Sequence, residues 1–82
     1  MVEKELNDII ELLDELKKDT TVPKNVKEKI DSTVKLLEDD EETAIKVNRA
    51  LHELEEVADD ANLQPFTRTR VWNIVSLLEK FT

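Results

Sequence analysis

The side chains that could take part in catalysis are one histidine, His52, two serines and a large number of carboxylates. A serine nucleophile needs a base within hydrogen-bond reach and an oxyanion hole. Neither Ser32 nor Ser76 has a histidine close to it in the sequence, and the chain contains no glycine with which to build an oxyanion loop. The carboxylates recur on the polar sides of helical patterns. We therefore expect a protein that is not an enzyme, with an enzyme of unrecognised type as the minor alternative.

Metal binding is the second kind of chemistry to test. Di-iron sites in helical bundles need glutamates from several helices and two inward-facing Glu-x-x-His pairs. The residue three positions before His52 is Arg49, and the chain has no cysteine. The acidic run at residues 38–42 lacks the spacing and the turn glycine of a calcium loop. We expect no metal and no other cofactor, and we expect His52 to be exposed on a helix flank.

Residues 62–79 contain the side chains best suited to binding another molecule. The segment includes the only tryptophan, Trp72, together with Phe66 and two of the three arginines, Arg68 and Arg70. Aromatic residues and arginine dominate binding hot spots. On a helix, positions 68 and 72 are one turn apart, so the guanidinium and the indole can lie side by side.

In an antiparallel bundle these arginines lie at the same end as several lysines. Two interpretations stay open: the cations pair with Asp19, Asp59 and Asp60, or they form a docking patch for an acidic partner or a phosphate. Trp72 is likewise either part of the core or part of an exposed interface. The candidate interaction surface consists of Lys24, Lys27, Phe66, Arg68, Arg70 and Trp72.

Helical periodicity organises the whole chain. The absence of glycine and the abundance of Leu, Glu and Lys favour an all-α protein. Apolar residues at i, i+3, i+4 and i+7 predict four helices. Their expected ranges are Val2 to Lys18, Pro23 to Leu37 or Glu38, Glu41 to Asp59 or Asp60, and Pro65 to Lys80. Every connector is short, so consecutive helices should pack antiparallel.

The apolar stripes of these four helices predict the core. Its expected members are Leu6, Ile9, Ile10, Leu13, Leu16, Val26, Ile30, Val34, Leu37, Val47, Ala50, Leu51, Leu54, Val57, Ala58, Val71, Ile74, Val75 and Leu78. The pattern repeats when the chain is shifted by 41 residues, which pairs Leu13 with Leu54 and Leu37 with Leu78. The single domain, residues 1–82, thus consists of two repeated helical hairpins, residues 1–41 and 42–82.

Two architectures can be built from such a pair of hairpins. One is a closed, antiparallel up-down four-helix bundle, and the other is a stack of two HEAT-like hairpins. With only two copies the open stack would leave apolar faces in water. The sequence therefore favours the closed bundle.

The net charge of −8 limits the classes of partner. Affinity for nucleic acid comes mainly from neutralising phosphates, so nucleic-acid binding is disfavoured without being excluded. An anionic membrane surface is disfavoured for the same reason, and no apolar run is long enough to span a membrane. The N-terminal sequence does not resemble a signal peptide. We expect a cytoplasmic protein with no evident small-molecule substrate.

Two segments resemble the signatures of a small archaeal family of uncharacterised proteins. They are DTTVPKNVK at residues 19–27 and TRTRVWNIVS at residues 67–76, the latter followed by Leu78 and Glu79. The resemblance covers essentially the whole chain and departs at Gln64, where the family pattern has a proline before Pro65. It implies a compact four-helix bundle and no assigned activity, cofactor or substrate.

These observations favour protein association, including self-association, as the function. The alternative from another class is a ribosome- or RNA-associated accessory protein that uses the basic end beside Trp72. Such a protein would have to be strongly polarised in charge, because its overall charge is negative.

Overall fold

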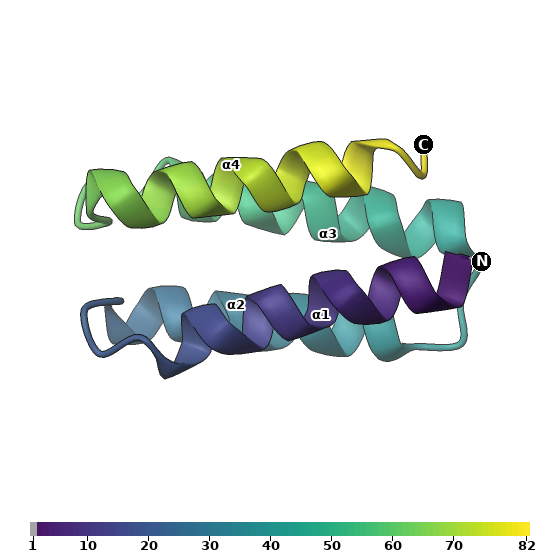
Figure 1. Cartoon of the computed structure of the whole chain (residues 1–82), viewed down its shortest axis with the longest axis horizontal. Helices are drawn as coiled ribbons and strands as arrows, with labels where there is room; N and C mark the ends of the chain where they lie inside the picture. The colour runs from purple at the N-terminus through teal and green to yellow at the C-terminus, as the bar shows by residue number, and fades with distance from the viewer. Residues whose placement is uncertain (1) are drawn as a thin grey trace.

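The computed structural model describes residues 2–82 as four helices joined by short connectors (Figure 1). The helices are α1 (Val2–Lys18), α2 (Lys24–Glu38), α3 (Thr43–Ala58) and α4 (Pro65–Glu79). Consecutive helices are antiparallel, with α1 in front of α2 and α4 in front of α3 in Figure 1. The last helix also packs against the first, which closes the bundle and excludes the open stack. Since residues 2–82 contain no strand, the predicted all-α four-helix bundle is confirmed.

The helix limits agree with the sequence prediction to within one residue except at α3, which begins at Thr43 and ends at Ala58. Glu41 and Glu42 lie in the connector before α3 and not in the helix. Two side chains from the first turns of α3 contact this connector. The ammonium of Lys46 donates to the carbonyl of Asp39 at 3.0 Å, and Arg49 pairs with Glu41 at 3.4 Å.

All four helices contribute to a single hydrophobic core. Helices α1 and α3 lie diagonally across the bundle, yet Leu13 and Leu16 of α1 are buried in the same cluster as Leu54 and Val57 of α3. Two connector residues, Val22 and Leu63, are also buried there. The core extends beyond the helices and fixes the connectors at the end where α4 begins.

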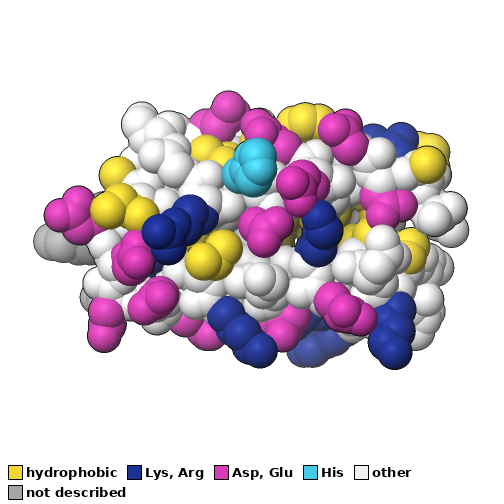
Figure 2. Space-filling model, turned by 180° about the vertical axis from the view of Figure 1, so that it is seen from behind, with side chains coloured by type: hydrophobic (Ala, Val, Ile, Leu, Met, Phe, Trp, Pro, Cys, Tyr) yellow, Lys and Arg dark blue, Asp and Glu magenta, His cyan; other side chains and the backbone are white. Residues whose placement is uncertain are grey.

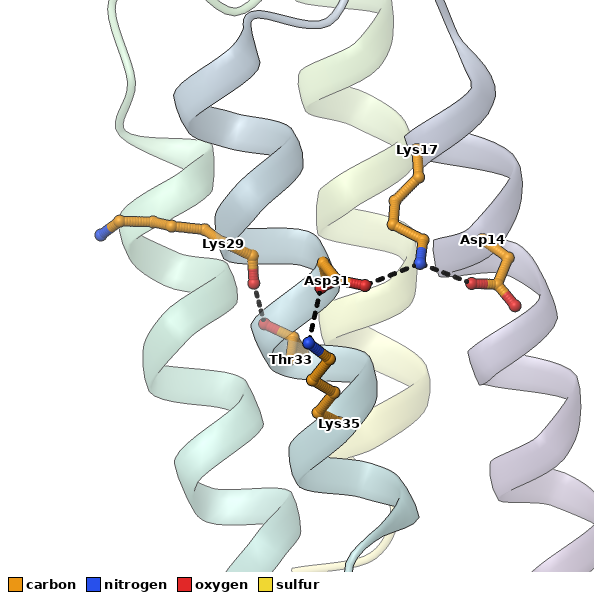
Figure 3. A network of polar contacts seen from close by, with 6 residues as sticks. All are labelled: Asp14, Lys17, Lys29, Asp31, Thr33 and Lys35. Atoms are coloured by element: carbon orange, nitrogen blue, oxygen red, sulfur yellow. Dashed lines mark hydrogen bonds and ion pairs between the residues drawn. The ribbon is translucent and has the colours of Figure 1, made fainter.

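Besides the two connector residues, four residues within the helices differ from the predicted core. Ile10 and Leu51 are only partly buried at its edge, whereas Thr33 and Thr67 are buried although the periodicity did not include them. The Thr33 hydroxyl donates to the carbonyl oxygen of Lys29 in the same helix at 2.8 Å (Figure 3). A threonine that bonds its own helix in this way can be buried without leaving a polar atom unpaired.

None of the helices over residues 2–82 combines the length and the apolar character that a membrane crossing requires.

Candidate interaction surface

The side of α4 that faces away from the core carries no charge over most of its length. From Pro65 to Ser76 its exposed residues are Pro65, Phe66, Thr69, Trp72, Asn73 and Ser76. By contrast, six of the eight exposed residues from Lys4 to Lys18 are charged, as are four of the six in α2. Figure 2 shows the opposite side of the molecule, where acidic and basic side chains are interspersed over α2 and α3. We call the six α4 residues the outer face of α4.

Both aromatic residues of the outer face are solvent-exposed. The exposed fraction is 72% for Phe66 and 44% for Trp72. The inward side of α4 is filled instead by buried Val71, Ile74, Val75 and Leu78, which complete the core without help from either ring. The sequence left open whether Trp72 lies in the core or on the surface, and the structure places it on the surface.

Arg68 points back into its own chain. Its guanidinium donates to the carbonyl oxygens of Ala58 and Asp60 at 2.9 Å each and to that of Leu63 at 3.3 Å. Ala58 is the last residue of α3, where unpaired carbonyls give the helix end a partial negative charge. Arg68 therefore caps α3 and holds the α3–α4 connector, which explains a cation near the start of α4.

The other basic residues at this end differ in their partners. Arg70 lies 3.8 Å from Glu15 and 3.9 Å from Asp19, while Lys29 pairs with Glu56. The lysines Lys24 and Lys27 form no ion pair with any of the described residues. Such surface pairs contribute about 0–1 kcal/mol each.

This end of the bundle is not basic as a whole. Residues 14–29 and 55–71, which surround the two connectors, contain seven basic and eight acidic residues. The strong charge polarity that an acidic RNA-binding protein would need is therefore not found here. Of the six candidate residues from the sequence, only Phe66 and Trp72 belong to the uncharged face, and Trp72 lies at the middle of α4.

The clearest polar network joins α1 to α2 on another side of the bundle (Figure 3). The ammonium of Lys17 lies 2.9 Å from Asp31 and 3.3 Å from Asp14, and Lys35 approaches Asp31 at 3.2 Å. The hydrogen bond from Lys17 lowers the pKa of Asp31, with Lys35 adding to the effect. The same contact with Asp31 raises the pKa of Lys17.

These shifts predict a pH window for the α1–α2 contact. Because the pKa of Asp31 is lowered from 3.8, its contribution to stability is complete above that value and is lost as the pH falls below it. Because the pKa of Lys17 is raised from 10.5, its contribution is lost only as the pH rises above that value. In Asp31→Asn we expect a smaller loss of stability between pH 7 and pH 3 than in wild type, measured by urea denaturation.

The control for this prediction is Glu28→Gln, which removes one exposed carboxylate from the same helix. It should keep the acid dependence of the wild type. Equal pH profiles for the two variants would show that the Asp31 network does not contribute.

His52 lies on an exposed flank of α3, where its side chain is 76% exposed and Nε2 lies 3.6 Å from Glu56. Among the described residues, no group of three or more His, Cys, Asp or Glu side chains could hold a metal ion.

A shallow groove runs along the seam between α1 and α4. Its larger part has a volume of about 330 Å³ and is lined by Glu5, Asp8, Ile9, Leu12, Leu77, Lys80 and Phe81. The ionisable residues of this lining are all exposed, so they lack the desolvation by which enzymes tune an acid or a base.

Fold and surface together define a small all-α bundle with an uncharged, aromatic-bearing face on α4 and mainly charged exposed surfaces on α1 and α2. The chain belongs to the uncharacterised protein family UPF0147, whose model matches residues 1–81. The predicted resemblance to a small archaeal family of uncharacterised proteins is thereby confirmed.

Curated relatives and one solved structure support this assignment. A UPF0147 protein of Methanocaldococcus jannaschii is 39% identical over 70 residues, which cover 84% of this chain and 75% of that protein. One from Thermoplasma volcanium is 42% identical over 74 residues, covering 89% of this chain and 83% of that protein. The crystal structure of the unknown function protein MMP1188 has a TM-score of 0.87 and 34% identity, and the match covers 92% of this chain and 86% of that one.

Proposed function

We propose that this protein is a non-enzymatic, cytoplasmic helical module that associates with another protein through the outer face of α4. The observation that carries the proposal is the concentration of two exposed aromatic residues on an uncharged face, in a chain of which 39% is charged. Protein interfaces are depleted of charge at their centres and enriched in aromatic residues. Tryptophan is among the residues that most often carry binding energy.

The repeat supplies an internal comparison for this face. At the positions that match Phe66 and Trp72, the first hairpin has Asn25 and Asp31. Helices α2 and α4 each supply a stripe of buried residues to the same core. Since α2 does so without aromatic residues, the fold does not require them on the outer side of α4. An exposed apolar patch of this kind normally marks a surface that binds something.

The first test uses a matched pair of photo-crosslinking residues. Benzoylphenylalanine at Asn73 would lie on the outer face of α4, and at Ser32 it would occupy the repeat-equivalent exposed position of α2. In native cell extract we expect a protein crosslink from position 73 and none from position 32. Adding Trp72→Ala should reduce the crosslink about tenfold or more, because truncating a hot-spot residue weakens binding by at least that factor.

Circular dichroism provides the control for folding. Since Trp72 is half-exposed, Trp72→Ala should keep the helical signal and nearly the same thermal midpoint. Equal crosslinking from both positions, or crosslinking that survives the loss of Trp72, would disprove the proposed function. Melting of the fold in Trp72→Ala would show that the indole serves the core.

A further inference from the structure

We infer that the partner at the outer face of α4 is a second copy of this chain, bound antiparallel across a two-fold axis at Thr69. The inference rests on the proposed function and names its partner. The residues that carry it are Phe66, Thr69 and Trp72, all exposed on one side of α4.

Charge complementarity is the first argument. A strongly acidic or basic partner would find no opposite charge on the outer face between Pro65 and Ser76. That surface fits a partner face that is itself uncharged and partly aromatic, and the chain presents such a face on every copy. With a net charge of −8, most contacts between two copies would be repulsive. The outer face of α4 allows two copies to meet without placing like charges opposite each other.

The spacing of the aromatic residues is the second argument. An isologous interface pairs residue i of one copy with residue j of the other, and residue j with residue i. Phe66 and Trp72 are each three residues from Thr69, which is about 4.5 Å along a helix. A two-fold axis at Thr69 therefore brings Phe66 of each copy to the same height along the paired helices as Trp72 of the other, with the rings flanking the two central threonines. The small threonine at the axis lets the two helices approach closely.

The position of the acidic connector is the third argument. Residues 39–42 are all acidic and join α2 to α3 at the end of the bundle opposite to the start of α4 (Figure 1). An antiparallel contact centred on Thr69, close to the start of α4, makes the two bundles extend in opposite directions. The two acidic connectors then lie at the far ends of the dimer, where their repulsion is smallest.

A disulfide across the axis tests the geometry, because the chain has no cysteine of its own. Packed helices lie about 8–10 Å apart and their Cα atoms lie about 2.3 Å from each axis, which leaves about 3.4–5.4 Å between the two Cα atoms at position 69, a range that overlaps the one a disulfide spans. A disulfide needs about 4.4–6.8 Å. Purified Thr69→Cys should therefore form a covalent dimer under mild oxidation, seen on a non-reducing gel.

The matched control is Ser76→Cys on the same face. Two copies of position 76 would be about 21 Å apart along the helices, so this variant should remain monomeric on the gel. Adding Phe66→Ala or Trp72→Ala to Thr69→Cys should slow crosslinking about tenfold. In sedimentation, the cysteine-free wild type should be a dimer, and Trp72→Ala should shift it towards monomer.

The outcome also separates this inference from the proposed function. If Thr69→Cys does not crosslink, or crosslinks no faster than Ser76→Cys, the second copy is not the partner. The proposed function then still stands if benzoylphenylalanine at Asn73 captures a protein of a different mass. If neither the disulfide at position 69 nor the crosslink from position 73 forms, both the dimer and the proposed function are disproved.

Discussion

Replacing Leu54 by alanine should lower the free energy of unfolding by about 2–5 kcal/mol, as truncation of buried leucines does. Leu54 is completely buried in the cluster to which all four helices contribute. An 82-residue bundle without disulfides has little stability in reserve, so we expect the variant to be largely unfolded at moderate temperature. Urea denaturation followed by circular dichroism measures the change.

The matched control is the same substitution at Leu12, which is 37% exposed beside the groove between α1 and α4. Leu12→Ala should cost about 1 kcal/mol or less, since little apolar surface returns to water. A Leu54→Ala midpoint no lower than that of Leu12→Ala would place the centre of the core elsewhere.

The fold could be predicted because its determinants are local in sequence. Apolar residues at helical spacing define the buried stripes, and Pro23 and Pro65 mark the starts of two helices. The limits of α3 were less accurate because they depend on contacts of Lys46 and Arg49 with the connector. Thr33 was missed because the periodicity of apolar residues does not register a hydroxyl that is satisfied by its own helix.

The candidate surface could be predicted only in part. Sequence indicated Phe66 and Trp72, but a residue that follows a buried valine on a helix can turn towards the core or away from it. The absence of charge on the outer face could not be seen in the sequence, because Arg68 and Arg70 lie among its residues in the chain. In the structure Arg68 contacts α3 and Arg70 contacts α1, so they lie on either side of this face. The sequence signal for this face is a set of uncharged residues at helical spacing on the side opposite to the buried stripe, and not the pairing of cations with aromatic residues.

The role of Arg68 leads to the second large effect. Its guanidinium bonds three carbonyl oxygens of the α3 end and the following connector, those of Ala58, Asp60 and Leu63. Hydrogen bonds that involve a charged group contribute about 1.5–3 kcal/mol each at most, and they share the cost of ordering one side chain. We expect Arg68→Ala to lower the free energy of unfolding by about 2–3 kcal/mol in urea denaturation.

The repeat provides the control, because Lys27 occupies the equivalent position at the start of α2. Lys27→Ala removes the same charge without a comparable set of bonds and should change stability by about 0.5 kcal/mol or less. Arg68→Lys should recover less than half of the loss, since an ammonium lacks the planar fork that reaches several carbonyls at once. If Arg68→Ala is as stable as Lys27→Ala, the guanidinium contacts contribute nothing to the stability of the fold. Arg68 would then be available, with Trp72, to bind a partner.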